Sequence, residues 1–198
     1  ALGGGVSIDT RTRAPGDLFI AIRGERFDGH AFLASALERG AGGVLVSRQV
    51  ESLTPAVLGD RLLIAAGDTT FALQALARYV RRRSAAHVVA ITGSAGKTTT
   101  KEMAAAFLAR RHRVMRSGGN LNNHIGLPLS LLEMRAGPDV AVVELGMNHP
   151  GEIRTLVGIA EPEVRVWTNV GDAHIGFFPS ADAIADAKAE ILEGLRPG

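Results

Sequence analysis

The chain has 198 residues, enough for one or two domains that each bury a hydrophobic core. Hydrophobic residues make up 46% of it, aromatic residues only 5%, and the formal net charge is +2. A nucleic-acid-binding protein would need a strongly basic surface with aromatic side chains for stacking, so this composition argues against that class.

Membrane and disulfide-rich classes are disfavoured as well. The sequence contains no apolar run long enough to span a bilayer and no recognisable signal peptide. It also contains no cysteine, which excludes disulfides and thiolate metal sites and is compatible with a cytoplasmic protein.

The first block of the pattern covers residues 1–84. Short apolar or alternating runs predict strands, and 3.6-residue spacing predicts helices. The expected elements, in chain order, are strands at 6–9 and 18–22, a helix at 31–39, strands at 43–47 and 62–65, and a helix at 68–83. In the last helix we expect Phe71, Leu76 and Val80 to face inwards. We expect its basic end, with Arg78, Arg81, Arg82 and Arg83, to be solvated and favoured by the helix dipole.

The second block, residues 85–198, alternates strands with helices. The expected elements are strand 87–92, helix 98–111, strand 113–116, helix 125–134, strand 139–144, helix 151–159, strand 164–169 and helix 180–195. Such alternation predicts an α/β domain with a mostly parallel sheet. In these sheets ligands bind beyond the carboxyl ends of the strands, so the residues that follow each strand are the candidates for a site.

A glycine-rich loop follows the first strand of this block. Residues 92–99 read Thr-Gly-Ser-Ala-Gly-Lys-Thr-Thr and stand between the expected strand and helix, which is the context of a phosphate-binding loop. The loop is shorter than the common P-loop, which has glycine where Ile91 stands. The predicted nucleotide-binding residues are Gly93, Ser94, Ala95, Gly96, Lys97, Thr98 and Thr99. Lys97 would reach the β- and γ-phosphates, and the Thr98 hydroxyl would hold Mg²⁺.

Polar residues lie at or just after the carboxyl ends of two further expected strands. Glu144 ends the apolar run Val-Ala-Val-Val, where a carboxylate can hold Mg²⁺ opposite Thr98. His174 lies in the loop after strand 164–169, and this position favours a metal or phosphate role. Lys188 is one of only three lysines against nineteen arginines, although composition alone favours a solvent-facing helix lysine.

Together these motifs resemble the Mur ligases, the ATP-dependent amide-bond-forming enzymes of peptidoglycan synthesis. The resemblance rests on the phosphate loop, Glu144-Leu-Gly-Met-Asn, Thr-Asn-Val-Gly-Asp-Ala-His174 and Ala-Lys188-Ala-Glu, in this order. In the first block, Asp-Thr-Arg at 9–11 and Phe-Asp-Gly-His at 27–30 resemble the family's UDP-binding domain. The stretch 119–128 resembles the member that joins D-alanyl-D-alanine to UDP-N-acetylmuramoyl-tripeptide, whereas the enzyme for the third residue is threonine-rich there.

The resemblance implies a role for each candidate residue. Lys97, His174 and Lys188 would be catalytic, and two Mg²⁺ ions would be held by Thr98 and Glu144 and by His174 and a carbamylated Lys188. ATP would phosphorylate the carboxylate of UDP-N-acetylmuramoyl-tripeptide, and the amine of D-alanyl-D-alanine would attack the acyl phosphate. The implied substrate-binding residues are Thr10, Arg11, Phe27, Asp28, Gly29, Asn120, Asn122 and Asn123. We expect a monomer in the cytoplasm that does not bind nucleic acid.

Two domains are expected: a UDP-substrate domain at 1–84 and part of an ATP-binding domain at 85–198. The family's third domain, which carries the amine site, has no counterpart in the sequence, so we expect the chain alone to be inactive. Two alternatives remain open at this point: another enzyme of the superfamily, such as an earlier-step ligase or a folylpolyglutamate synthase, and a non-catalytic nucleotide-binding module. Binding of a UDP-sugar would distinguish the D-alanyl-D-alanine-adding ligase from these two alternatives.

Overall fold

The computed structural model describes residues 4–12, 14–24, 27–51, 53–171, 176 and 178–195. The chain divides into two compact units, Ala1–Leu73 and Gln74–Gly198, each with its own parallel sheet. Each unit is α/β, as expected. Among the described residues, no helix is both long and apolar enough to cross a membrane.

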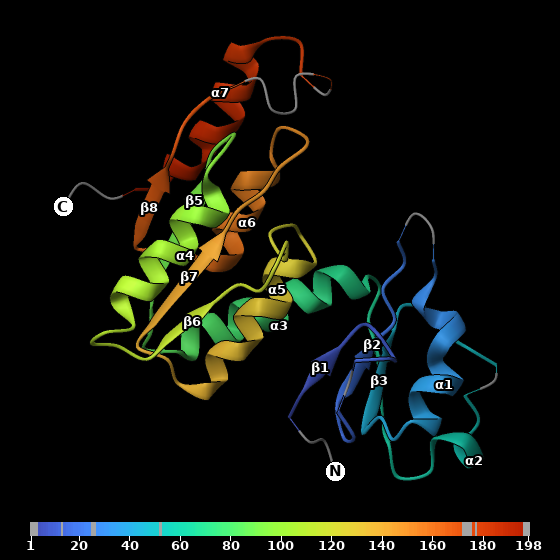
Figure 1. The fold of residues 1–198 in the computed structure, drawn as a ribbon. Coiled ribbons are helices and arrows are strands. Elements are labelled where there is room, and N and C mark those ends of the chain that lie inside the picture. Colours follow the sequence, from blue (N-terminus) through green and yellow to red (C-terminus); the bar gives the residue numbers. More distant parts are fainter. Residues whose placement is uncertain are drawn as a thin grey trace. The chain divides into compact units, whose positions relative to one another are not determined.

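The first unit is a parallel sheet of four strands in the order β1-β2-β3-β4 (Figure 1). Its strands are β1 (Val6–Ser7), β2 (Leu18–Ile20), β3 (Gly43–Val46) and β4 (Leu62–Ala65). Its helical elements are η1 (Gly29–Phe32), α1 (Leu33–Glu38) and α2 (Pro55–Leu58). Residues of α1 pack on β2 and β3 to form the core, in which Phe19, Leu33 and Val44 are buried.

The second unit holds a parallel sheet of four strands in the order β6-β7-β5-β8. The strands are β5 (His87–Thr92), β6 (Val114–Arg116), β7 (Val140–Glu144) and β8 (Val164–Trp167). The helical elements are α4 (Lys97–Leu108), α5 (Gly126–Leu131), η2 (Leu132–Ala136), α6 (Glu152–Ala160), α7 (Ala181–Ala189) and η3 (Glu190–Leu192). All five residues of β7 are buried, because helices cover both faces of a parallel sheet.

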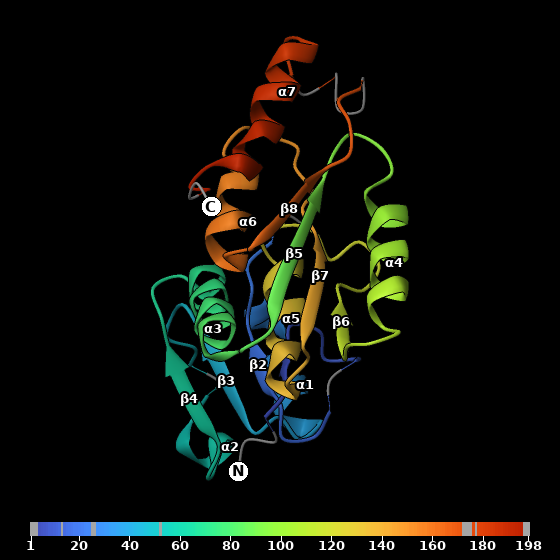
Figure 2. The ribbon, with the colours of Figure 1, turned by 90° about the vertical axis from the view of Figure 1, so that its left-hand side faces the viewer.

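The helices that follow β5 and β7 lie on opposite faces of this sheet (Figure 2). Helix α4 packs Ala105 against Ile91 and Val142 on one face, and α6 lies on the other. Since β5 and β7 are neighbours, their carboxyl ends border the crevice that opens where successive helices leave in opposite directions. The strand order therefore places a ligand site between the phosphate loop and Glu144.

Helix α3 (Thr69–Arg83) differs from its expected burial pattern. Phe71 is 69% exposed, and the buried positions are Leu73, Ala77 and Arg81. The prediction of an inward Phe71 was wrong because Phe71 lies about 200° around the helix from Leu73, on the face opposite to the buried stripe.

At the basic end of this helix, Arg78, Arg82 and Arg83 are exposed as expected, but the expectation of a solvated side chain was wrong for Arg81. Its guanidinium is buried and donates to the carbonyl oxygens of Ala160 (2.8 Å), Ala86 (3.2 Å) and Glu161 (3.0 Å). It also pairs with the Glu163 carboxylate at 2.5 Å. Because all these acceptors belong to the second unit, Arg81 fixes this end of α3 to that unit, and the division of the chain falls within α3, between Leu73 and Gln74.

Smaller differences concern helix ends. The expected helix at 180–195 is α7 followed by the 3-10 turn η3, and the expected helix at 125–134 is α5 followed by η2. Helix α2 was not predicted; Thr54 caps it and Pro55 occupies its first turn.

Candidate active site

The phosphate loop takes a conformation that glycine makes possible. Gly96 has φ +79° and is the N-cap of α4, and Gly93 has φ +150°. A Cβ on Gly93 would lie 1.9 Å from Thr168 Oγ1, so a side chain cannot be accommodated there. No side chain caps α4 at its N-cap residue, so the first N–H groups of α4 are available to an anion at the positive end of the helix dipole.

The loop after β8 holds the phosphate loop in place. Asn169 accepts from Ala95 N with its side-chain Oδ1 (2.9 Å) and from Ser94 N with its carbonyl (3.1 Å). Thr168 Oγ1 donates to the Ala95 carbonyl (2.7 Å), and Ser94 Oγ bonds Gly171 at 2.9 Å and 3.1 Å. Thr168 and Asn169 were not among the predicted site residues, although their position at a strand end was a usable signal. They fix the loop before any ligand binds.

Lys97 lies over this loop. Its Nζ donates to the Gly93 carbonyl at 2.7 Å and is 3.5 Å from the Ser94 carbonyl. The ammonium group is therefore held at the mouth of the loop, beside the N–H groups that would meet a phosphate.

Thr98 and Glu144, predicted as a pair, are in direct contact. Thr98 Oγ1 donates to Glu144 Oε2 at 2.7 Å, and Asn122 Nδ2 donates to Glu144 Oε1 at 2.8 Å. Glu144 is only 3% exposed, so both carboxylate oxygens are fixed in a buried position. Two oxygen ligands of this kind, next to a phosphate site, suit Mg²⁺, which prefers one or two carboxylates together with substrate phosphates and water.

Two further buried residues, Ser117 and Lys101, support Glu144 through hydrogen bonds that the sequence did not predict. Ser117 Oγ accepts from the Glu144 backbone N–H at 3.2 Å. The fully buried Lys101 donates to the Ser117 carbonyl at 2.7 Å and pairs with Glu102 at 3.3 Å. The segment between β6 and α5 is thereby tied both to α4 and to the end of β7, which positions Asn122.

Lys188 is buried rather than solvent-facing, with 1% of its surface exposed. Burial, with a smaller contribution from the positive charge of Lys97, lowers the pKa of Lys188 from 10.5 to about 8. Within the part of the chain that the structure describes, the Lys188 side chain makes no hydrogen bond or ion pair. Lys188 is thus a buried amine with no hydrogen bond or ion pair among the described residues, and the charge of Lys97 disfavours its protonated form. His174, the other predicted ligand, lies outside the described residues.

In the first unit, three of the predicted substrate residues line one cavity. A cavity of about 440 Å³ is lined by Ile8, Asp9, Thr10, Arg11, Phe19, Phe27 and Phe32. Asp9 holds the Arg11 guanidinium through both carboxylate oxygens, and this pairing lowers the pKa of Asp9 to about 2. The site combines an oriented cation with the exposed Phe27 ring, a combination suited to a phosphorylated ligand with a planar base.

Asp28 and Gly29, also predicted to bind substrate, have structural contacts. Asp28 accepts from His30 Nδ1 (2.6 Å) and from the His30 backbone (2.9 Å), which lowers its pKa. Because His30 Nε2 accepts from the Ser47 backbone N–H at 3.0 Å, Nδ1 must carry the ring proton. A Cβ on Gly29 would lie 2.8 Å from Ile22 N, so this glycine allows close packing below the cavity.

The three predicted asparagines have different environments. Asn122 bonds Glu144, as described. Asn123 Oδ1 accepts from Ile125 N and Gly126 N at the start of α5, so that oxygen is engaged by the backbone. Asn120 is exposed, and its carbonyl accepts from Asn122 N at 2.8 Å.

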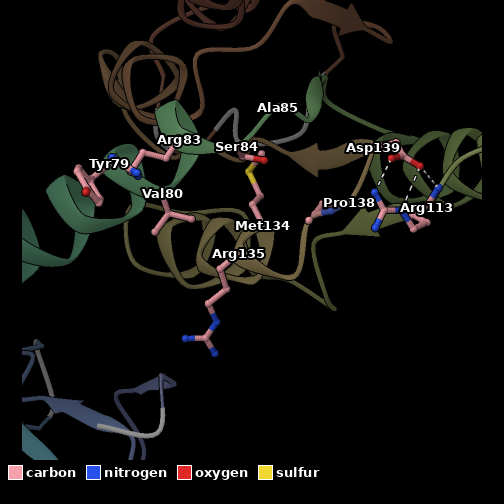
Figure 3. Close-up of a pocket in the computed structure, with 11 residues that line it drawn as sticks. Tyr79, Val80, Arg83, Ser84, Ala85, Arg113, Met134, Arg135, Pro138 and Asp139 are labelled. Carbon is pink, nitrogen blue, oxygen red and sulfur yellow. Dashed lines mark hydrogen bonds and ion pairs between the residues drawn. The ribbon is translucent and has the colours of Figure 1, made fainter.

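A larger cavity, about 510 Å³, lies away from these residues at the amino ends of the strands of the second unit. Figure 3 shows Arg113 paired with Asp139 on one side and Arg83 beside Tyr79 on the other, with the arginine carbon 5.6 Å from the ring centre. None of the predicted site residues lines this cavity. The volume of a cavity therefore does not identify the candidate site in this protein.

Comparisons with known families assign the chain. Its residues 4–116 match the model for the Mur ligase family, catalytic domain, and residues 91–198 match the Mur ligase middle domain. The chain belongs to the Mur ligase family. This confirms the resemblance drawn from the motifs. The matched ranges include the phosphate loop and Glu144 of this Mur ligase chain.

Two curated relatives of this Mur ligase chain carry the same name. The chain is 44% identical over 192 residues to the UDP-N-acetylmuramoyl-tripeptide–D-alanyl-D-alanine ligase of Bacillus subtilis, covering 97% of this chain and 41% of the relative. It is 44% identical to the enzyme of the same name from Escherichia coli, covering 96% and 40%. The chain therefore spans about two fifths of the length of these relatives.

Two solved structures of proteins named MurF have a fold similar to that of this chain. A crystal structure of MurF from Acinetobacter baumannii superposes with a TM-score of 0.88 at 40% identity, covering 97% of this chain and 41% of that one. MurF from Thermotoga maritima, solved in complex with ADP, has a TM-score of 0.84 at 36% identity, with 96% and 43% covered.

Proposed function

We propose that the complete protein joins D-alanyl-D-alanine to UDP-N-acetylmuramoyl-tripeptide at the expense of ATP, in the cytoplasm, where nucleotide-activated precursors are made. The observation that carries the proposal is the contact between Thr98 and Glu144 at the mouth of the phosphate loop. The names of the relatives support the same reaction. The loop, the oxygen ligands and the Lys97 ammonium are what carboxylate activation by ATP requires.

The reaction has two steps. The terminal carboxylate of the tripeptide attacks the γ-phosphorus of ATP, giving an acyl phosphate and ADP. The neutral amine of D-alanyl-D-alanine then attacks the acyl carbon and loses a proton as the amide bond forms, and phosphate leaves with the electron pair of the broken C–O bond. Two anions must approach each other in the first step, so positive charge at the loop lowers its barrier.

Residues of the chain supply this charge and orientation. In our proposal, residues 93–99 form the phosphate site. The N–H groups of residues 96–99 and the Lys97 ammonium would hold the β- and γ-phosphates, because the Ser94 and Ala95 N–H groups already donate to Asn169. Asn169 and Thr168 keep the loop in its bound shape, because they already occupy its other hydrogen-bonding groups. Preorganised donors of this kind stabilise charge without reorganisation during the reaction.

The chain also offers ligands for Mg²⁺. Thr98 Oγ1 and Glu144 Oε2, 2.7 Å apart, would hold one ion, with Asn122 orienting the carboxylate. When bound, the ion neutralises phosphate charge. Among the described residues no group of three or more His, Cys, Asp or Glu side chains is gathered, which fits an ion bound largely through phosphates and water.

Lys188 is proposed to act as a carbamate. A neutral amine adds to CO₂ and loses a proton, and the lowered pKa of about 8 makes the neutral amine available near neutral pH. The buried amine lacks a partner among the described residues, and the carbamate anion would gain one in the nearby Lys97 or in a second Mg²⁺ ion. His174 is proposed as a ligand of that second ion.

The uridine diphosphate part of the substrate is proposed to bind in the cavity of the first unit. Arg11 and Thr10 would meet the diphosphate, and Phe27 the base, while Asp28 and Gly29 shape the loop beneath. Asn120 and Asn123 are proposed to contact the sugar-peptide part. We propose that the domains correspond to residues 1–84 and 85–198 and that the protein acts as a monomer.

The test is a ligation assay on the complete enzyme with ATP, Mg²⁺, the UDP-linked tripeptide and D-alanyl-D-alanine. We expect the UDP-linked pentapeptide, ADP and phosphate to form in equal amounts, and a tripeptide amidated at its terminal carboxylate to give none. ADP formation that does not depend on the tripeptide would contradict the proposal and indicate a simple nucleotidase or binding module.

A further inference from the structure

The carboxylate of Glu190 is buried although no catalytic role requires it. Glu190 is 5% exposed and begins η3, two residues after Lys188. Its Oε1 accepts from Gly151 N at 2.7 Å and its Oε2 from Arg154 N at 2.9 Å. Both carboxylate oxygens therefore bond backbone N–H groups at the start of α6.

Through these two hydrogen bonds, Glu190 caps the N-terminus of α6 although it does not belong to that helix. The N-cap residue of α6 is Gly151, which has φ +86° and no side chain to cap with. An N-cap side chain normally accepts from the second or third N–H of a helix, and Arg154 is the third residue of α6. The Glu190 charge also lies at the positive end of the helix dipole.

The two hydrogen bonds connect the turn that carries Lys188 and Glu190 to the end of the loop that follows Glu144. Helix α6 starts at Glu152, after the loop that follows β7, and α7 packs against α6. Residues 188 and 190 are about 200° apart around a helix, so fixing Glu190 on α6 sets the rotation of this turn and thereby the direction of Lys188.

We propose that Glu190 is a positioning residue that fixes the Lys188 side chain in its buried position by capping α6. This inference rests on the proposed function, because Lys188 matters for catalysis only if it carries the carbamate. Without the two bonds, the turn is free to rotate, and the amine loses the buried position in which the carbamate forms.

Glu193 offers a matched control. It lies three residues further along, is 47% exposed at its side chain, and pairs with the Arg154 guanidinium at 2.6 Å and 2.7 Å. It contacts the same residue as Glu190 but bonds no α6 backbone N–H among the described residues. Glu193→Gln therefore removes the same charge without loosening the cap.

The experiment compares the complete wild-type enzyme with Glu190→Gln, Glu190→Asp and Glu193→Gln. The first readout is the ¹³C NMR signal of the lysine carbamate in buffer with ¹³C-bicarbonate. The second is the bicarbonate concentration that gives half-maximal ligation after CO₂ depletion. We expect Glu190→Gln to lose most of the carbamate signal, to need about tenfold more bicarbonate, a change of about 1.4 kcal/mol, and to keep its KM for the UDP-linked substrate. Glu193→Gln should behave like wild type.

A lower melting temperature of Glu190→Gln with unchanged carbamate signal and bicarbonate dependence would overturn the proposal, since it would show a purely structural carboxylate. If Glu190→Gln does not fold, Glu190→Asp gives the same readouts with the charge retained and the reach shortened. Absence of carbamate in the wild type would remove the proposed role of Lys188 and this inference together. A wild-type carbamate unaffected in both Glu190 variants would remove this inference alone.

Discussion

The Thr98 hydroxyl donates a 2.7 Å hydrogen bond to Glu144 Oε2, although the two residues are 46 positions apart in the chain. The contact arises because β5 and β7 are neighbours, with Ile91 paired with Glu144. It joins the first turn of α4 to the end of β7 at the point where a metal-bound phosphate would lie.

Thr98 variants test this contact. Thr98→Val keeps the shape of the side chain but removes the oxygen, so we expect ligation to fall about 100-fold or more and to need higher Mg²⁺. Thr98→Ser keeps the hydroxyl and should stay within about fivefold of wild type. The measurement is the initial rate as a function of Mg²⁺ concentration, and equal Mg²⁺ dependence of both variants would contradict the assignment.

Lys97→Ala should abolish ATP-dependent ligation while leaving binding of the UDP-linked substrate largely intact. Lys97 belongs to the second unit, and the proposed uridine cavity is lined by residues of the first. Turnover and calorimetric titration on the same preparation check both parts. Arg110→Ala, which removes an exposed cation from the far end of α4, serves as control. Near wild-type turnover of Lys97→Ala would show that the loop is not the phosphate site.

The lowered pKa of Lys188 predicts a pH-dependent effect on stability. Between pH 8 and 10.5 the unfolded chain binds more protons at this lysine than the folded chain, so this group raises the free energy of unfolding as pH increases. Lys188→Met removes the effect. In CO₂-depleted buffer, the stability gain of the variant over wild type should therefore be largest at pH 7 and shrink towards pH 10. Urea unfolding at several pH values measures it, and a gain that does not vary with pH would argue against the shifted amine.

Arg81 and Arg82 are neighbours with different expected contributions to stability. Arg81→Met leaves buried carbonyl groups without donors and should lower the free energy of unfolding by about 3 kcal/mol. Arg82→Met loses only a solvent-exposed pair with Glu161 and should lower the free energy of unfolding far less than Arg81→Met does. Equal effects of the two substitutions in urea unfolding would refute the buried role of Arg81.

Residues 1–198 by themselves should bind the UDP-linked peptide weakly and should not catalyse ligation. Attack on the acyl phosphate needs the amine held at about 3 Å from the carbon, and such positioning supplies much of the rate enhancement. The chain divides into two compact units, in which we propose the uridine cavity and the phosphate site but no site for D-alanyl-D-alanine. Calorimetry with each substrate tests this, and tight binding of the dipeptide would show that the acceptor site has been misplaced.

The sequence by itself determined the features that depend on neighbouring residues. Alternating patterns located the strands of both sheets, and the Gly93–Gly96–Lys97 spacing located the phosphate loop, because backbone conformation and loop chemistry are local properties. The ends of strands 139–144 and 164–169 pointed to Glu144 and to the loop that clamps residues 94 and 95. The family followed from the order of these motifs.

Only the tertiary structure decided which groups are buried and which meet. The strand order β6-β7-β5-β8 brings Asn122 and Thr98 onto Glu144, and no periodicity encodes that order. Lys188 and Arg81 look like ordinary surface cations in the sequence, and Phe71 looks like a core residue. Burial depends on what the rest of the chain packs against each position. The burial of Lys188 and Arg81 and the exposure of Phe71 could therefore be assigned only once the helices were placed on the sheet.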